Sequence, residues 1–78
     1  MKGSEGRAAY SNICKQFINF HPLFALLNLP SADGNYISAL KDATEEDLST
    51  ALSIMEVYPE GNSSRITACR KRLNELMY

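Results

Sequence analysis

Apolar residues recur at helical spacing along the first third of this chain. Residues at i, i+3, i+4, i+7 and i+8 form one face of a helix, and here they are Tyr10, Ile13, Cys14, Phe17 and Ile18. This pattern predicts a helix that starts at Arg7. We expect it to end near Phe20, because His21 precedes Pro22 and a residue before proline avoids the helical conformation. Pro22 suits the first position of a second helix, which extends to about Asn28 and is apolar nearly all round.

Polar residues mark the ends of the helices in the rest of the chain. Asn35 is a candidate N-cap for one or two helical turns that end near Asp42. Thr44 is a stronger N-cap, because three acidic residues follow it and negative charge complements the helix dipole there. Pro59 ends that helix, and a last helix begins near Ser63. The apolar positions are Leu48, Ala51, Leu52, Met55 and Tyr58 in the first of these long helices, and Ile66, Cys69, Leu73 and Leu76 in the second.

These elements predict an all-α fold, a compact bundle of four or five short helices. The short turn between residues 44–58 and residues 63–77 favours a C-terminal antiparallel helical hairpin. Strand signals are weak throughout. With 78 residues the chain makes one helical domain, residues 7–78, preceded by a flexible N-terminus, residues 1–6, that holds two glycines.

Charge is close to balanced overall but separated along the chain. Eight basic and nine acidic residues give a net charge of −1, which indicates no global preference for nucleic acid. Residues 41–60 hold one lysine and six acids, a net of −5, whereas residues 61–78 hold four basic residues and one acid, a net of +3. A charged binding partner therefore remains a candidate, provided that the acidic and basic segments do not neutralise each other.

The sequence predicts no enzyme and no cofactor. His21 is the single histidine, and neither a Ser-His-Asp set nor a glycine-rich phosphate loop is present. Cys14 and Cys69 lie 55 positions apart, each on an apolar helix face. We expect two buried, reduced thiols rather than metal ligands, with a disulfide between them as the alternative. No signal-peptide pattern follows Met1, and the longest apolar stretch, residues 17–29, is too short and too interrupted for a bilayer. This favours a cytoplasmic protein without a membrane partner.

Two surfaces are candidates for binding. The last helix carries a basic cluster, Arg65, Arg70, Lys71 and Arg72. Its charges could form intramolecular salt bridges, bind an acidic protein partner, or, ranked lowest, bind nucleic acid. The apolar block of residues 17–29 is the second candidate. It either forms plain core or leaves a surplus near Phe20, Leu23 and Phe24 that would be covered by a second copy or by a partner helix.

The sequence therefore predicts a small non-enzymatic protein-binding module that acts as an adaptor, inhibitor or regulator. Small helical chains of this kind are common among the accessory proteins of bacteria and phages. The protein partner is unidentified, and a homodimer is a further candidate. The alternative functions are a small nucleic-acid-binding regulator that uses the basic helix, and a structural homo-oligomer built on the apolar block.

Overall fold

A computed structural model of the chain describes residues 3–17 and 22–77. Five α-helices and one short 3-10 helix make up this part of the protein, and it contains no strand. The helices are α1 (Gly3–Cys14), α2 (Pro22–Asn28), α3 (Gly34–Asp42), α4 (Glu45–Met55) and α5 (Ser63–Met77), with the 3-10 helix η1 (Pro59–Gly61) between the last two. The radius of gyration is 11.8 Å, in line with roughly 11–12 Å expected for a compact chain of this length. The predicted all-α class is confirmed.

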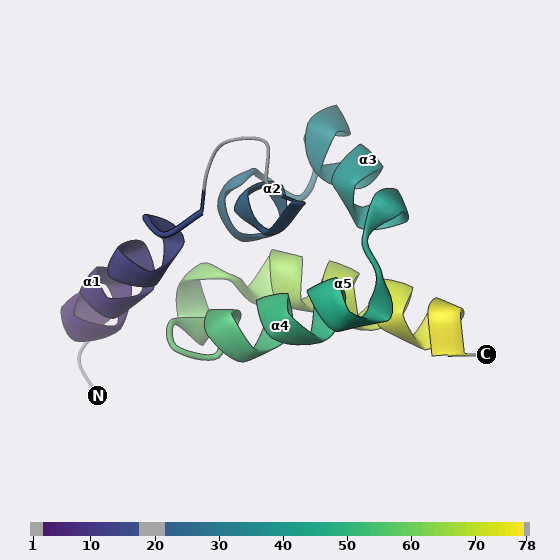
Figure 1. Cartoon of the computed structure of the whole chain (residues 1–78). Coiled ribbons are helices and arrows are strands. Elements are labelled where there is room, and N and C mark those ends of the chain that lie inside the picture. Colours follow the sequence, from purple (N-terminus) through teal and green to yellow (C-terminus); the bar gives the residue numbers. More distant parts are fainter. Residues whose placement is uncertain (1–2, 18–21, 78) are drawn as a thin grey trace.

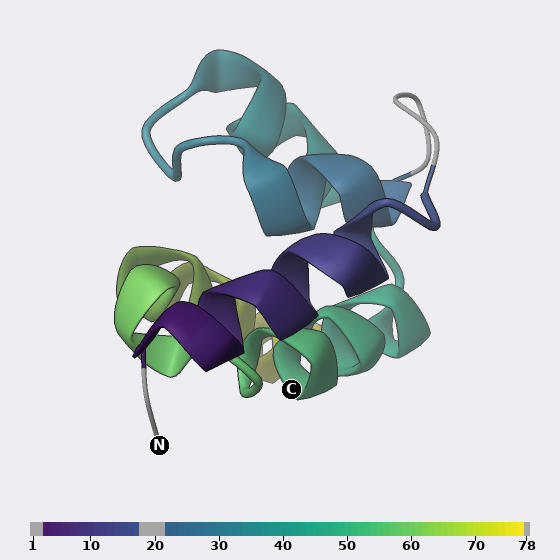
Figure 2. The ribbon, with the colours of Figure 1, turned by 90° about the vertical axis from the view of Figure 1, so that its left-hand side faces the viewer.

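The helices form two layers with α1 at one end. Helices α4 and α5 lie side by side and make the most extensive helix–helix contact in the described chain. In Figure 1 the chain runs leftward along α4, turns through η1 and returns along α5. Helices α2 and α3 lie over this pair, and Figure 2 shows α1 crossing the end of both layers. The C-terminal part of α5 extends beyond the helices that cover the rest of it.

Capping side chains explain where the middle helices begin. Asp33 caps α3, and its Oδ1 accepts a hydrogen bond of 2.8 Å from the backbone N–H of Asn35. The N-cap of α3 is therefore Asp33. The predicted N-cap, Asn35, lies two residues after it. Thr44 caps α4 as predicted, and it shares a reciprocal capping box with Asp47. Pro22 begins α2, also as predicted.

The core lies where α2, α3, α4 and α5 meet. Its largest fully buried side chains are Tyr36, Leu26, Leu27, Leu48, Met55, Asn62 and Cys69. Leu23, Leu26 and Leu27 of α2 are buried, because this short apolar helix contacts all four other α-helices. On α5 only Cys69 is fully buried, whereas Leu73 is half-buried and Leu76 is 36% exposed. The predicted apolar seam of α5 therefore becomes more exposed towards its C-terminus.

The first helix differs most from its predicted bounds. It begins at Gly3 rather than Arg7, Gly6 is buried within it, and it ends at Cys14, after which residues 15–17 form a turn. The predicted continuation through Ile18 to Phe20, and the role of His21 at the junction, lie outside the described residues. The flexibility expected of residues 1–6 stays a prediction.

Candidate functional site

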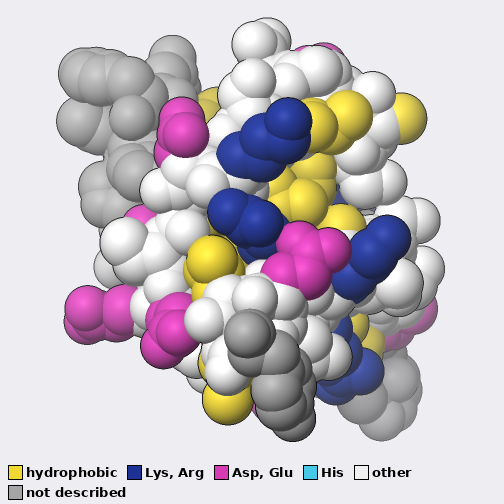
Figure 3. All heavy atoms as spheres, turned by 90° about the vertical axis from the view of Figure 1, so that its right-hand side faces the viewer, with side chains coloured by type: hydrophobic (Ala, Val, Ile, Leu, Met, Phe, Trp, Pro, Cys, Tyr) yellow, Lys and Arg dark blue, Asp and Glu magenta, His cyan; other side chains and the backbone are white. Residues whose placement is uncertain are grey.

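A groove opens between α3 and α5 on the face shown in Figure 3. Its volume is about 410 Å³, and its walls are Ile37, Leu40 and Lys41 from α3 and Ala68, Lys71, Arg72 and Glu75 from α5. In Figure 3 hydrophobic side chains lie in the hollow, with basic side chains on both sides of it and acidic side chains close by. This volume falls within the range of roughly 300–1,000 Å³ that is typical of ligand pockets.

Helical periodicity explains how each wall is built. On α3, Tyr36 points into the core and is fully buried, which leaves the neighbouring face, Ile37, Leu40 and Lys41, at the i, i+3 and i+4 positions beside it. On α5 the wall follows the same rule, because Ala68 is followed by residues three, four and seven positions later. Each helix thus shares its residues between the core and the groove, and Ile37 is left 45% exposed.

The groove carries more positive than negative charge. Lys41, Lys71 and Arg72 contribute cations and Glu75 contributes the one carboxylate among the lining residues. Arg72 is tied to its surroundings: its Nη1 lies 3.2 Å from Glu75 Oε1, and its Nη2 donates a 3.1 Å hydrogen bond to the carbonyl oxygen of Lys41. Glu75 is therefore already paired, whereas the ammonium groups of the two lysines make no hydrogen bond or ion pair within the described chain.

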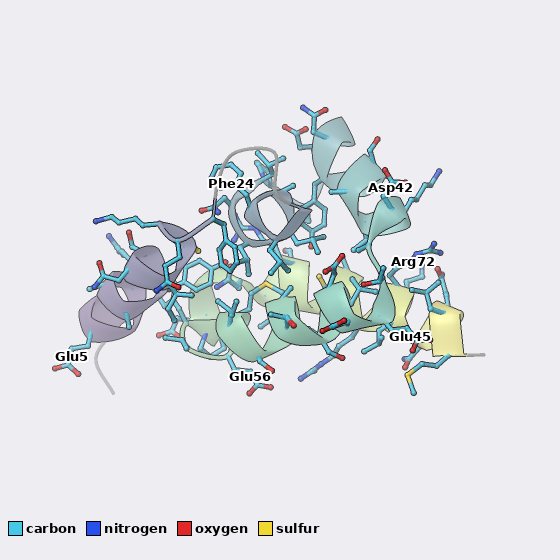
Figure 4. The ribbon with its side chains drawn as sticks, viewed as in Figure 1. Glu5, Phe24, Asp42, Glu45, Glu56 and Arg72 are labelled. Atoms are coloured by element: carbon cyan, nitrogen blue, oxygen red, sulfur yellow. The ribbon has the colours of Figure 1, made fainter. Side chains whose placement is uncertain are left out.

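Arg72 also fastens α5 to the end of α3. The carbonyl of Lys41 belongs to the last turn of α3, where backbone oxygens lack helical partners and the helix dipole favours a cation. The Arg72 Nε–H is buried and has no hydrogen-bond acceptor among the described residues. Figure 4 places Arg72 at the same end of the molecule as Asp42 and Glu45.

Arg65, the first residue of the predicted basic cluster, makes three hydrogen bonds within the molecule through its guanidinium. Its Nε donates a 2.7 Å hydrogen bond to the carbonyl of Leu29, and its Nη2 donates a 3.0 Å bond to the carbonyl of Asn28. Its Nη1 donates to Oδ1 of Asn62 at 2.5 Å. The guanidinium thus closes the C-terminal end of α2, which is the same role that Arg72 has at α3.

Arg70 and Lys71 make up the remainder of the cluster. Both are exposed, and neither forms a hydrogen bond or ion pair with a described residue. Lys71 lines the groove and Arg70 does not. The cluster that appears continuous in the sequence is therefore divided between two half-buried arginines bonded to other parts of the molecule and two exposed cations without a partner among the described residues.

In its described part, the second predicted surface is largely core. Leu23 is buried, with 6% of its surface exposed, and Phe24 is half-buried. Phe24 lines a smaller hollow between α1 and α2, together with Arg7, Tyr10, Ser11, Cys14, Lys15, Phe17 and Asn28. Phe20 lies outside the described residues. Of the predicted apolar contact residues, Leu23 therefore belongs to the core, and Phe24 lies half-buried in the hollow beside α1.

Both cysteines are free and buried, as predicted. Burial raises the pKa of the Cys69 thiol, whose sulfur lies 3.3 Å from the hydroxyl of Tyr36. Burial likewise raises the pKa of the Cys14 thiol and of the Tyr36 and Tyr10 phenols. The Tyr10 hydroxyl donates a hydrogen bond to the carbonyl oxygen of Leu27. Both thiols and both phenols are therefore neutral near pH 7. A cysteine that acts as a nucleophile would instead have to ionise to the thiolate.

The described chain has neither a cluster of metal-binding side chains nor a membrane-spanning helix. No three histidine, cysteine or acidic side chains among residues 3–17 and 22–77 come together as a metal-binding group would require. In the same ranges, no helix is both long enough and apolar enough to cross a membrane.

Comparison with protein-family models, with curated proteins and with solved structures finds no match to this chain. The assignment of the candidate site therefore rests on the geometry and chemistry of its own residues.

Five residues of the groove were not among the predicted binding residues: the apolar Ile37, Leu40 and Ala68, and the charged Lys41 and Glu75. The signal of the apolar wall in the sequence is a second, short periodicity beside the main apolar face, with Ile37 and Leu40 one turn apart. In so short a helix this pattern fits a core face equally well. Only the position of α3 relative to α5 shows that part of it stays uncovered.

Proposed function

We propose that this chain is a small non-enzymatic protein-binding module that docks an apolar segment of a partner protein in the groove between α3 and α5. The observation that carries the proposal is the exposed apolar surface of this groove, centred on Ile37. Among the described residues the other exposed large apolar side chains are Leu76 and Met77, near the C-terminal end of α5 and outside the groove. An apolar hollow with a charged rim is typical of surfaces that receive a partner segment. Two free buried thiols suit a reducing compartment, so we infer a cytoplasmic location.

The two alternative functions find less support. A nucleic-acid-binding helix needs several cations that can reach phosphates, and two of the four candidates, Arg65 and Arg72, are engaged with helix ends. A homo-oligomer built on residues 17–29 needs that block to be exposed, whereas Leu23, Leu26 and Leu27 are buried. A second copy that covers the groove is instead an outcome that the binding experiment distinguishes.

The test begins with selection of binding peptides from a displayed library of random peptides. Selected peptides are titrated into isotope-labelled protein, and amide shifts are followed by nuclear magnetic resonance. We expect shifts at the groove residues, and we expect Ile37→Ala to weaken binding about 5- to 30-fold, since it removes roughly 1–2 kcal/mol of apolar contact.

Met77→Ala is the matched control. Met77 is also an exposed apolar residue, 62% exposed, but it does not line the groove. Both variants should melt at the wild-type temperature. The proposal fails if no peptide shifts the groove residues, or if the two variants weaken binding equally.

A further inference from the structure

The charge around the groove indicates which kind of segment fits it, an inference that rests on the proposed function. Lys41 belongs to the α3 wall and Lys71 to the α5 wall, so each wall of the groove has one lysine. Both side chains are exposed, and neither ammonium group has a partner in the described chain. The single carboxylate of the lining, Glu75, is paired with Arg72.

A segment that fills this groove would therefore meet two unneutralised cations. An uncharged or basic segment would leave both lysines unpaired at the edge of an apolar contact, whereas carboxylates on either side of an apolar anchor would pair with them. Complementary charge also speeds the encounter and makes it sensitive to salt. The electrostatics thus favour a partner that is acidic on both sides of its apolar residues.

The floor of the groove indicates the shape of the partner. Ala68 is the smallest of the lining side chains, so it occupies the least of the space between α3 and α5. Ile37 and Leu40 are one helical turn apart along the opposite wall. A groove between two helices receives a third helix through apolar side chains spaced three or four residues apart. The described chain has no strand edge to which an extended peptide could add.

We propose that the occupant of the α3–α5 groove is an acidic amphipathic helix of a partner protein. Its apolar side chains, one turn apart, contact Ile37, Leu40 and Ala68. Its flanking carboxylates pair with Lys41 and Lys71. Arg72 stays bonded to Glu75 and to the carbonyl of Lys41 at the end of α3. Its role is to position the α5 wall, and the lysines contact the partner.

The experiment uses three synthetic helical peptides as probes. The first carries leucines at i, i+3 and i+7 with glutamates on both sides of the stripe, the second replaces every glutamate with lysine, and the third replaces every leucine with serine. Binding to the whole protein is measured by fluorescence anisotropy at low and at high salt. We expect the acidic leucine peptide to bind at least about tenfold more tightly than either of the others, and to weaken as salt increases.

Two protein variants locate the charge effect. Lys71→Glu should weaken the acidic peptide about tenfold and reduce its salt dependence. Arg70→Glu makes the same charge change one residue away, at an exposed position outside the groove, and should weaken it by less than about threefold. Ala68→Leu should fill the hollow and reduce binding of every peptide that uses it.

The outcomes separate this inference from the proposed function. If the basic leucine peptide binds as tightly as the acidic leucine peptide, the groove binds proteins but the acidic-helix proposal is wrong. If equal losses for Lys71→Glu and Arg70→Glu are measured, it is also wrong. If light scattering shows a dimer that Ile37→Ala dissociates, a second copy occupies the groove and the proposal is overturned. If no peptide of any charge reaches the groove, the proposed function itself fails.

Discussion

Arg65 offers the sharpest test of how this fold is held together. Its guanidinium joins the first turn of α5 to the C-terminal end of α2 through two backbone carbonyls, that of Asn28, the last residue of α2, and that of Leu29, which follows it. It also donates to the side chain of Asn62, a residue that is 1% exposed. Arg65→Met keeps much of the aliphatic side chain but removes all three hydrogen bonds.

The loss can be estimated from these contacts. A hydrogen bond from a charged donor contributes about 1.5–3 kcal/mol, and a buried acceptor left without a partner costs about 1–3 kcal/mol. Two of the three bonds, to Leu29 and to Asn62, are partly buried, and the third is exposed to solvent. Because such terms do not add fully, we expect Arg65→Met to lower the free energy of unfolding by about 2–4 kcal/mol. That is a large share of roughly 4–12 kcal/mol for a domain of this size.

Urea unfolding followed by circular dichroism measures the effect, with Arg70→Met as the matched control. Arg70 lies on the same helix, carries the same charge and is exposed without a partner in the described chain. Its replacement should change stability by no more than about 0.5 kcal/mol. Arg65→Lys should fall between the two, because lysine cannot reach three acceptors with a planar fork. Equal midpoints for Arg65→Met and Arg70→Met would refute the role assigned to Arg65.

Two further predictions concern packing and pH. A methyl group at Gly61 would overlap the ring of Tyr58, whereas one at Gly34 would meet open space, and neither glycine has a positive φ. Gly61→Ala should therefore lower the free energy of unfolding by about 1–3 kcal/mol in urea titrations. Gly34→Ala should be neutral or slightly stabilising. A loss that is the same for both glycines would contradict the predicted overlap. Because burial raises the pKa of Tyr36 above its ordinary 10.0, the native state keeps a proton that the unfolded chain releases, so this contribution to stability is complete below pH 10 and declines as pH rises further. Urea midpoints measured from pH 7 upward should fall less steeply above pH 10 in Tyr36→Phe than in the wild type, and parallel curves would count against the buried phenol.

Much of the secondary structure could be predicted because its causes are local. Thr44 and Asp47 cap α4 through bonds within one turn, and Pro22 begins α2 because proline suits a first helical position. The errors arose where local signals compete. Asp33 and Asn35 are both good caps two residues apart, and the choice between them depends on where the preceding loop leaves the backbone. The start of α1 at Gly3 had no cap signal that distinguished it from Arg7.

The candidate site was harder to predict because it depends on contacts between distant residues. Leu23 and Phe24 look alike in an apolar run, but one is buried and the other is half-buried at the edge of α1. Ile37 looks like a core residue of α3, and it is exposed because α3 turns Tyr36 inward instead.

The sequence by itself determined that this protein is helical, where most of its helices begin and that its thiols are buried, because capping, proline geometry and apolar periodicity act within a few residues. Only the tertiary structure decided what the basic helix does. Arg65 and Arg72 lie seven residues apart on one face of α5, which α2 and α3 cover with their C-terminal ends, so both guanidinium groups bind backbone carbonyls there. Arg70 and Lys71 lie between them in the sequence of the same helix and remain exposed. The charge of each residue is set by its side chain, but its partner is set by which helix end packs against it.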